Sequence, residues 1–221
     1  MSLTTNDVIT RASVILLDTS NVRWSVSELL AWVNDGRRDM ATLRPDLYAV
    51  RTSLSLVPGA RQSLPSDGIR LVDITHNTSG PAVTVTQKES LDLFQSNWQS
   101  GTQSGTITHF MTDERYPTDF WVYPPASNTA SLEIIYYGKP ADYNSGDALS
   151  TQEGMYLSAL VDYVCYRGFA KDTEYAGSAD RAVMHYNNFK GALQAGGQIS
   201  LLTSPNSANI GGTPSRIMGT A

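Results

Sequence analysis

The stretch "LVPGARQSLPSDGIRLVDI", Leu56 to Ile74, decides the fold. Two turn signals, Pro58-Gly59 and Pro65-Ser66-Asp67-Gly68, interrupt a run in which apolar and polar residues alternate. Alternation with a period of two is typical of strands, and Pro and Gly at these positions are typical of the turns between them. We therefore predict β-hairpin structure here, although the chain on both sides has helical periodicity. Because the stretch carries no catalytic motif, we interpret it as a structural wall rather than a reaction site.

The two-residue period continues through the middle of the chain. In "VRTSLSLV", for example, Val50, Thr52 and Leu54 share one face of a strand. The predicted strands are 50–56, 61–64, 69–75, 82–86, 107–112, 119–123 and 132–137. Between them, "KESLDLFQSNW" predicts a short helix or irregular loop that rests on Leu91, Phe94 and Trp98. Short strands at this spacing predict a small β-sandwich or a barrel-like insertion.

Helical periodicity flanks this region on both sides. Apolar residues recur every three or four positions in "DVITRASVIL", "WSVSELLAWVNDGRRDMATLRP", "STQEGMYLSALVDYVCYRGFAKD" and residues 177–195. The capping-box pairs that mark helix starts are Thr4 with Asp7, Ser25 with Glu28, and Ser150 with Glu153. At the other end, Gly196-Gly197 predicts where the last helix stops.

Together these patterns predict an α+β fold. Two N-terminal and two C-terminal helices form a four-helix bundle, which the β-sandwich or barrel-like insertion interrupts. An extended C-terminal tail follows the bundle. The predicted parts are 1–48 for the N-terminal helices, 49–139 for the insertion, 140–198 for the C-terminal helices and 199–221 for the tail.

Composition narrows the classes of function. The 221 residues carry a net charge of −5 and lack the basic patch of a nucleic-acid-binding domain. A weakly acidic surface would suit DNA that slides past it. The single cysteine, Cys165, lies in an apolar run, so we expect it to be buried and unpaired. The N-terminus "MSLTTNDVIT" lacks a signal-peptide pattern, and no apolar run is long enough to span a membrane, so we expect cytosolic assembly without membrane contact.

Catalytic and cofactor-binding motifs are missing from the sequence. It has no phosphate-binding Gly-rich loop, no His-Glu-x-x-His, no Cys-x-x-Cys and no Gly-x-Ser-x-Gly. The three histidines, His76, His109 and His185, fall in separate predicted elements, which argues against a metal site. We therefore expect no enzyme activity, no cofactor and no metal.

A carboxylate cluster near aromatic residues is the exception that we weighed. Asp113, Glu114 and Asp119 lie close in sequence to Tyr116 and Trp121, and paired carboxylates beside aromatics are what glycosidases use. Acidic residues are also common at turns, and aromatics alternate in strand cores. We favour the structural interpretation.

Two groups of residues are candidates for interfaces. Arg37-Arg38 on the second predicted helix could contact DNA phosphates, but Asp35 and Asp39 interleave with them and favour a solvated or interface face. The C-terminal tail has one charged residue and apolar residues spaced among polar ones, a pattern that suits docking on a partner as a strand or arm. Its candidate residues are Ile199, Leu201, Leu202, Ile210, Arg216, Ile217 and Met218.

Four segments resemble one known family. "VRWSVSELLAWVNDGRRDMATLRPD", "LVPGARQSLPSDGIRLVDITHN", "FWVYPP" and "LEIIYYGKP" are similar to the phage adaptor proteins of short-tailed bacteriophages, head-to-tail connectors like tail tubular protein A. The resemblance runs from about Asp7 to Phe189. It implies a helical bundle with a β-rich insertion and a structural protein without catalytic residues.

The resemblance also implies partners and a location. Adaptors of this kind form a dodecameric ring between the portal protein and the tail nozzle, a protein like tail tubular protein B. Genomic DNA passes through the lumen without sequence-specific binding. We therefore expect a homo-oligomer at the head-tail junction of the virion, assembled in the host bacterial cytoplasm.

Interface roles follow from this expectation. The tail residues are candidates for contact with the portal or a neighbouring subunit. The candidates for contact between subunits or with the nozzle are Arg37, Arg38, Trp98, Tyr116 and Trp121.

Three alternatives remain open from the sequence. The chain could be a receptor- or carbohydrate-binding β module, which would need an exposed aromatic platform around Trp98 and Trp121. It could be a connector with peptidoglycan hydrolase activity, which would need a carboxylate pair in a cleft. It could also be a tail terminator or stopper of a long-tailed phage, which would likewise assemble as a ring of identical subunits.

Overall fold

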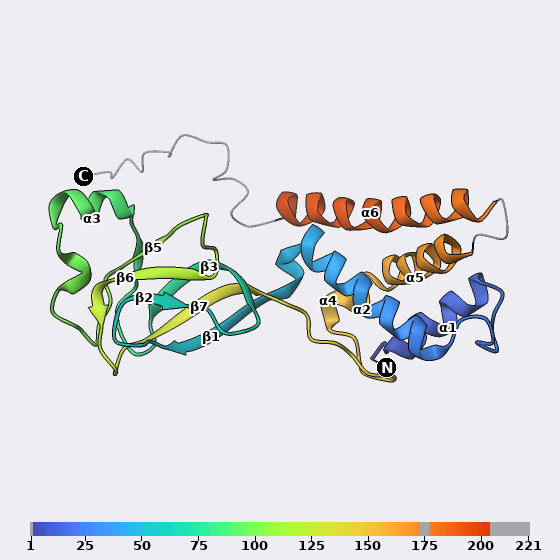
Figure 1. The fold of residues 1–221 in the computed structure, drawn as a ribbon, viewed down its shortest axis with the longest axis horizontal. Coiled ribbons are helices and arrows are strands. Elements are labelled where there is room, and N and C mark those ends of the chain that lie inside the picture. The colour runs from blue at the N-terminus through green and yellow to red at the C-terminus, as the bar shows by residue number, and fades with distance from the viewer. Residues whose placement is uncertain (1, 173–176, 204–221) are drawn as a thin grey trace, which may run out of the picture. The chain divides into compact units, whose positions relative to one another are not determined.

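The computed structural model describes residues 2–172 and 177–203 (Figure 1). The chain divides into two compact units. The helical unit contains the residues up to Arg44 and from Asp142 onward, and the β unit contains Pro45–Ala141. The β unit is therefore an insertion in the sequence of the helical unit. The predicted mixed α+β class is confirmed, with six α-helices and two sheets among the described residues.

Five of the α-helices belong to the described part of the helical unit. They are α1 (Thr5–Ile15), α2 (Val26–Leu43), α4 (Thr151–Met155), α5 (Leu157–Lys171) and α6 (Ser178–Thr203). Helix α5 contacts α1, α2 and α6, so it is the central helix of this unit. Its side chains Leu160, Val164 and Cys165 are fully buried, as the apolar period predicts.

Local capping explains where the first two helices begin. The Asp7 carboxylate accepts hydrogen bonds from the Thr4 backbone N–H (2.8 Å) and hydroxyl (2.7 Å), as predicted for α1. At α2 the Ser25 hydroxyl accepts from the Glu28 backbone N–H at 3.3 Å. The Glu28 carboxylate bonds to Lys171 of α5. Ser25 thus caps α2 as expected, while Glu28 joins two helices.

Two of the helix predictions are wrong in detail. The third predicted helix is broken at Tyr156 into α4 and α5, so the unit has five helices rather than four. The last helix does not stop at Gly196-Gly197 but continues to Thr203, so residues 199–203 are helical rather than extended. A Cβ on Gly196 would lie 2.0 Å from the Tyr156 hydroxyl oxygen, and one on Gly197 would lie 3.3 Å from Cδ of Arg44. The two glycines therefore form a notch in the surface of α6, in which the side chains of Tyr156 and Arg44 lie. They do not end the helix.

The β unit contains seven strands, one short α-helix and two 3₁₀ turns. In chain order they are η1 (Pro45–Tyr48), β1 (Ala49–Ser55), β2 (Gly59–Ser63), β3 (Gly68–Asn77), β4 (Thr84–Val85), α3 (Lys88–Phe94), η2 (Trp98–Ser100), β5 (His109–Thr112), β6 (Asp119–Ala126) and β7 (Ser131–Gly138). One sheet has the order β1-β7-β3 and the other β2-β6-β5-β4 (Figure 1). All pairs are antiparallel except β4 with β5.

Each of the two turns in residues 56–74 carries the chain from one sheet to the other, so the hairpin prediction for this stretch is wrong. β1 pairs with β7, β2 pairs with β6, and β3 returns to β7. The buried Gln62 side chain holds the first switch: it accepts from the Val57 backbone N–H (2.9 Å) and donates to the carbonyls of Val57 (2.8 Å) and Gly59 (3.0 Å). Gly59 has a φ of +124°, a conformation that favours glycine. These bonds replace the ladder that a hairpin would supply.

One apolar core lies inside the β unit and draws on both sheets. Its buried members include Leu71 and Ile74 of β3, Leu132 of β7, and Phe120 and Val122 of β6. The members in β6 and β7 follow the two-residue period of those strands, whereas in β3 the buried residues recur every three positions because its pairing with β7 has three register shifts. A smaller cluster of Ala60, Trp98 and Met111 has the half-buried Leu91 of α3 packed against it.

Candidate functional site

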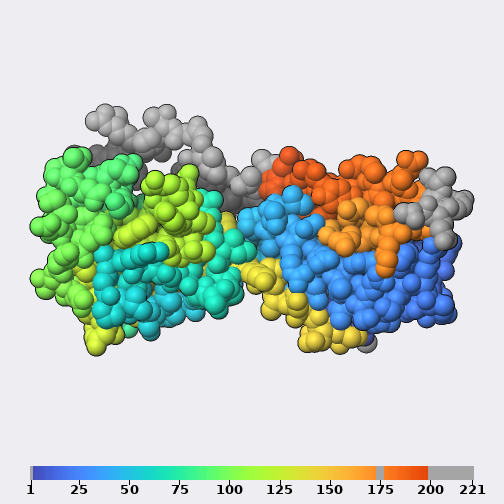
Figure 2. Space-filling view, viewed as in Figure 1, coloured from blue at the N-terminus to red at the C-terminus, as the bar shows by residue number. Residues whose placement is uncertain are grey.

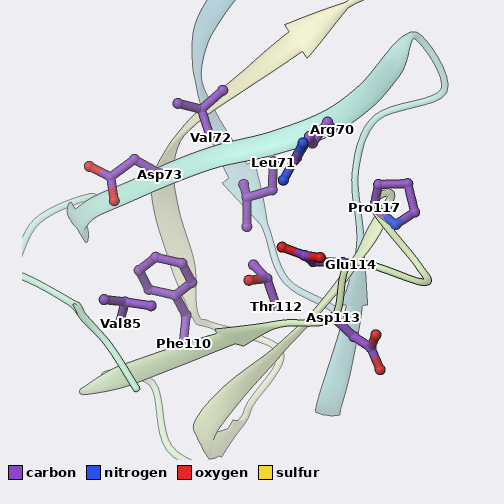
Figure 3. A pocket seen from close by; sticks show the side chains of 10 residues that line it. All are labelled: Arg70, Leu71, Val72, Asp73, Val85, Phe110, Thr112, Asp113, Glu114 and Pro117. Atoms are coloured by element: carbon purple, nitrogen blue, oxygen red, sulfur yellow. The ribbon is translucent and has the colours of Figure 1, made fainter. Parts of the chain in front are cut away.

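A cavity of about 260 Å³ opens between β3 of one sheet and β5 of the other (Figure 3). Leu71 and Phe110, both buried in the core, form its apolar floor together with the exposed Val85. Polar and charged side chains surround this floor. They are Arg70, Asp73, Thr112, Asp113 and Glu114. An apolar centre with a polar rim is the usual anatomy of a protein interaction site.

A second hollow of about 750 Å³ adjoins this cavity and shares Val85 and residues 112–114 with it. The hollow continues to Tyr116 and Trp121, two of the predicted interface residues. Tyr116 is exposed, whereas Trp121 is half-buried. The structure thus brings these two candidates to one surface of the β unit, where the loop between β5 and β6 meets the start of α3.

Asp113 holds that loop through a three-fold contact with Arg115. Its carboxylate accepts from the Arg115 backbone N–H (3.0 Å), Nε (3.0 Å) and Nη2 (2.7 Å). The side-chain bonds from Arg115, followed by the backbone bond, lower the pKa of Asp113 to about 2. A glycosidase needs a carboxyl group with a raised pKa to act as general acid. This loop therefore gives the hydrolase alternative no support.

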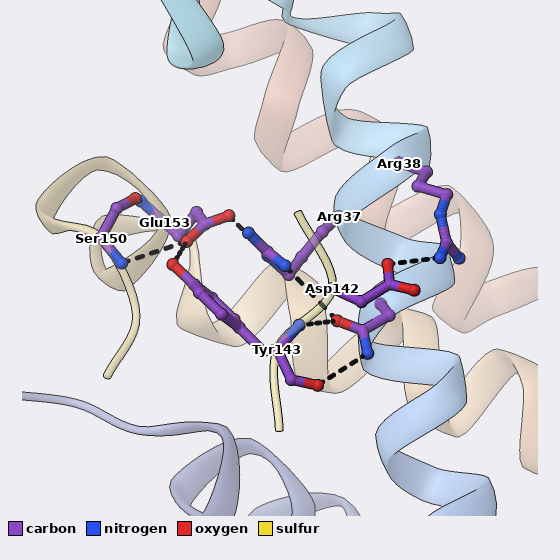
Figure 4. A network of polar contacts seen from close by, with 7 residues as sticks. Arg37, Arg38, Asp142, Tyr143, Ser150 and Glu153 are labelled. Atoms are coloured by element: carbon purple, nitrogen blue, oxygen red, sulfur yellow. Dashed lines mark hydrogen bonds and ion pairs between the residues drawn. The ribbon is translucent and has the colours of Figure 1, made fainter. Parts of the chain in front are cut away.

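A buried ion pair at the other candidate position stabilises the helical unit (Figure 4). Arg37 of α2 donates from Nε to Oε1 of Glu153 in α4 at 2.7 Å, and both side chains are almost fully buried. The Tyr143 hydroxyl donates to Oε2 of Glu153 at 2.9 Å, and the Arg37 guanidinium lies 3.5 Å from the Tyr143 ring centroid. The predicted interface role of Arg37 is wrong, because this residue is inside its own chain.

The network also fixes the segment that leads into α4. Asn34 donates from Nδ2 to the Tyr143 carbonyl (3.0 Å) and accepts from the Tyr143 N–H (2.9 Å). Ser150 and Glu153 form the predicted capping box, with bonds of 3.1 and 3.2 Å. Burial alone would raise the pKa of Glu153, but the bonds from Arg37, Ser150 and Tyr143 lower it below the usual value. Glu153 therefore caps α4 and neutralises Arg37 as a carboxylate.

Arg38 of α2 and Arg44, which follows the end of α2, also have partners within the helical unit. Arg38 is partly exposed and bonds to Asp35 (2.9 Å) and to Asp142. The buried Arg44 donates from Nη1 to the Tyr156 hydroxyl (3.1 Å) and to a carbonyl of α6 (3.0 Å). Of the predicted pair Arg37-Arg38, only Arg38 is left at the surface as a candidate contact.

Of Leu91, Phe94 and Trp98, on which the sequence predicts that this segment rests, Phe94 is exposed, and the burial of Trp98 contradicts its predicted interface role. Trp98 is fully buried and donates from Nε1 to Asp92 at 2.8 Å, so it cannot form an exposed platform or an interface. Phe94 is 90% exposed, and its neighbour Leu93 is 83% exposed. The spacing of Leu91 and Phe94 suggested one shared buried face, but α3 ends at Phe94 and Trp98 fills the buried position instead. The signal that we missed is the adjacent pair of apolar residues at the end of a short helix.

The three histidines lie in separate places, as the sequence predicts. His76 bonds to Thr75, His109 to Thr84, and His185 to Asp162. Over residues 2–172 and 177–203, no group of three or more His, Cys, Asp or Glu side chains could hold a metal ion.

A family model describes nearly the whole chain. The model of the SU10 adaptor protein family matches residues 3–209. The chain belongs to this family of phage adaptor proteins. The match covers both the helical unit and the β unit, so the insertion is part of the adaptor fold. A search of the curated proteins finds no match.

Membership of this adaptor family implies a structural role in the virion, at the junction of head and tail. An adaptor acts through the surfaces that it presents to other virion components. The exposed apolar and polar patches of this chain are therefore the residues that matter for this role. None of the helices in the described part of this adaptor has the length and apolar character to cross a membrane.

The predicted tail residues fall in two groups. Ile199, Leu201 and Leu202 lie in the last turns of α6. Ile210, Arg216, Ile217 and Met218 lie outside the described residues.

Proposed function

We propose that this chain is one subunit of a ring that joins the portal of the phage capsid to the tail nozzle. The observation that carries the proposal is the family match over residues 3–209. A ring requires many copies of one chain, and repetition of a single heterologous contact around an axis produces such a ring. We expect twelve subunits, by analogy with the head-to-tail connectors that the sequence resembles.

The two units suit two separate tasks in such a ring. In our proposal the helical unit is a bundle-like body that faces the portal, and the β unit is a sandwich-like insertion that faces a nozzle protein like tail tubular protein B. The buried Arg37–Glu153 pair and the capping boxes support a rigid body. Genomic DNA would pass through the lumen without sequence-specific contacts, which suits a chain with a net charge of −5.

The C-terminal segment is the part that we assign to anchoring. Residues 204–221 carry Ile210, Ile217 and Met218 among polar residues and only one charge, Arg216. In our proposal this segment attaches to the portal or to a neighbouring adaptor. Because α6 reaches Thr203, a truncation that tests the segment must begin at Ser204 and leave α6 whole.

The structure weakens the carbohydrate-binding and hydrolase alternatives. The carbohydrate module needed an exposed aromatic platform around Trp98 and Trp121, but Trp98 is buried and Trp121 is half-buried. The hydrolase needed a carboxylate pair in a cleft; Asp113 and Glu114 both line the cavity between β3 and β5, but Arg115 binds the Asp113 carboxylate and lowers its pKa, which does not suit a general acid. A zymogram on peptidoglycan gives a direct test of the second alternative, since a cleared zone would favour it.

The assembly test compares masses with and without the portal protein. Purified full-length chain, the truncation from Ser204 and an equimolar mixture with portal rings are measured by native mass spectrometry. We expect the full-length chain to form a closed ring on the portal and the truncation to bind more weakly. A full-length chain that never binds portal rings and never self-associates would overturn the proposal. Equal binding by the truncation would overturn only the anchoring role.

A further inference from the structure

Two neighbouring apolar side chains project from α3 without cover from the described chain. Leu93 is 83% exposed and Phe94 is 90% exposed. Single exposed apolar residues are common on protein surfaces, but adjacent large ones at this level of exposure point to a partner. We call Leu93 and Phe94 the α3 knob. It lies at the C-terminal end of α3, which Figure 1 labels and Figure 2 draws in green within the β unit.

The α3 knob is held in place rather than loosely attached. On the same helix, Leu91 packs against the cluster of Trp98, Ala60 and Met111. Asp92, the residue before the knob, accepts from Trp98 Nε1 at 2.8 Å and from Lys88 Nζ at 2.9 Å. These contacts fix the rotation of α3 about its axis. The knob is therefore presented to solvent in one orientation, which lowers the entropy lost when it binds.

The cavity between β3 and β5 is of a size and chemistry to receive an aromatic side chain. Its volume is about 260 Å³, and its floor is Leu71 and Phe110 with Val85 beside them (Figure 3). An apolar cavity of about 150 Å³ is already large enough to bind benzene. Neither residue of the α3 knob lines this cavity or the adjoining hollow, so the chain does not fill the cavity with its own knob.

We infer that the α3 knob of one copy inserts into the β3–β5 cavity of the next copy. This inference rests on the proposed ring, in which each copy must carry two different and complementary patches. The knob and the cavity are such a pair, and both belong to the single compact unit Pro45–Ala141. Phe94 enters the cavity over Leu71 and Phe110, while Leu93 covers the exposed Val85 at its edge.

The knob is an anchor within a larger interface. A stable contact buries on the order of 800 Å² on each partner, which is more than two side chains provide. Interfaces nevertheless depend on a few buried aromatic anchors, surrounded by contacts that mainly exclude water. The polar rim of the cavity, with Arg70, Asp73 and Glu114, supplies the surrounding contacts.

The first experiment measures self-association of three variants by sedimentation velocity, alone and on portal rings. Phe94→Ser removes the knob, and Thr112→Trp fills the cavity from its exposed rim. Val57→Ser is the matched control, because Val57 is an exposed apolar residue of the same unit that lines neither hollow. We expect the first two variants to raise the dissociation constant at least about tenfold, as truncation of an anchor does, and the control to behave as wild type. Circular dichroism verifies that each variant is folded.

The second experiment mixes the two defective variants. The Phe94→Ser chain keeps its cavity and the Thr112→Trp chain keeps its knob, so one good contact can form between them. We expect the mixture to form pairs that do not grow into rings. If two knobs packed against each other instead, Thr112→Trp alone would associate as wild type does, which would overturn the inference.

The outcomes separate this inference from the proposed function. If wild type forms rings and Phe94→Ser does so equally well, the knob is not the contact, while the ring proposal stands. If Phe94→Ser keeps self-association but loses binding to portal rings or to the nozzle protein, the knob serves another partner and the inference is wrong. If wild type stays monomeric alone and with portal rings, the proposed function and the inference fail together.

Discussion

Gly196 lies where α6 meets two side chains from elsewhere in the helical unit, and its replacement by alanine should destabilise that unit. A Cβ at this position would lie 2.0 Å from the Tyr156 hydroxyl oxygen, 2.9 Å from its Cζ and 3.1 Å from Arg44 Nη1. Contacts of this length cannot persist, so the Tyr156 ring must move. The hydrogen bond that Arg44 Nη1 donates to the Tyr156 hydroxyl at 3.1 Å would then be lost.

Three effects set the expected magnitude. Overpacking by one methyl group costs about 1–3 kcal/mol, and loss of a hydrogen bond to a charged group costs about 1.5–3 kcal/mol. Alanine is better than glycine inside a helix by about 1 kcal/mol, which offsets part of this. We expect Gly196→Ala to lower the free energy of unfolding by about 2–4 kcal/mol. Gly191→Ala on the same helix should raise it by about 0.5–1 kcal/mol, since a Cβ there meets nothing within 4 Å.

Urea unfolding followed by far-ultraviolet circular dichroism measures this difference, because the signal comes mainly from the helical unit. A further check is to make Gly196→Ala in a chain that already carries Tyr156→Phe. The Tyr156→Phe change removes the oxygen nearest to the new methyl group but leaves Cζ at 2.9 Å, so it should recover part of the loss caused by Gly196→Ala. If Gly196→Ala and Gly191→Ala change the unfolding midpoint equally, the notch between α6 and Tyr156 does not exist as described.

Three more predictions concern the buried groups of the helical unit. Glu153→Gln should lower the free energy of unfolding by about 3–5 kcal/mol in urea titrations, because it removes the carboxylate charge that the buried Arg37 guanidinium contacts at 2.7 Å. Asp142→Asn at the exposed Arg38 pair should cost at most about 1 kcal/mol. The folded pKa of Glu153 is below its unfolded value, so its contribution is present above the unfolded pKa and is lost as the pH falls through the folded pKa. Acid titrations of stability should therefore be steeper for wild type than for Glu153→Gln, and parallel curves would contradict this account. Burial raises the pKa of Cys165 to about 12, so a thiol reagent at neutral pH should label Cys165 only as fast as the helical unit opens. Rapid labelling of the native protein would contradict the burial of this thiol.

The sequence predicted those features that depend on local periodicity. The strands of the β unit appear close to their expected ranges because alternation of apolar residues reports which face is buried. Helix starts at Thr4, Ser25 and Ser150 were predictable because a capping side chain bonds to a backbone group within one turn. Each of these signals acts over a few residues and needs no knowledge of the rest of the fold.

Features set by distant partners were not predictable in the same way. Pro58-Gly59 marks a turn, but the same pair can close a hairpin or move the chain to another sheet. The partner of β1 is β7, and their register pairs Ala49 with Tyr137, which lies 88 positions later in the chain (137 − 49). Here the Gln62 side chain stabilises the move to the other sheet, because it donates hydrogen bonds to the carbonyls of Val57 and Gly59 in the turn. The burial of Gln62 was not predictable, because a polar residue in an alternating strand normally marks the exposed face.

Charged residues show the same limit. Arg37 and Arg38 are neighbours in sequence and had one predicted role, yet Arg37 is buried against Glu153 and Arg38 remains at the surface. Adjacent residues on a helix point about 100° apart, so two arginines in a row cannot both face the same partner. The residue that determined which of them turned inward was Glu153, which lies in the other half of the split helical unit.

The candidate contact between copies departs from this geometric rule. In α3, the i,i+3 spacing would place Phe94 beside the half-buried Leu91, but α3 ends at Phe94 and the buried Trp98 packs there instead. Leu93 and Phe94 are therefore left exposed. A polar pair at these two positions would serve the fold of a single copy equally well, since Leu93 and Phe94 contribute almost no buried surface to it. Their apolar character therefore has no explanation within the part of the chain that the structure describes. An adaptor that repeats around an axis supplies one, because in our inference the cavity over Leu71 and Phe110 belongs to the next copy and is brought to every α3 knob in turn.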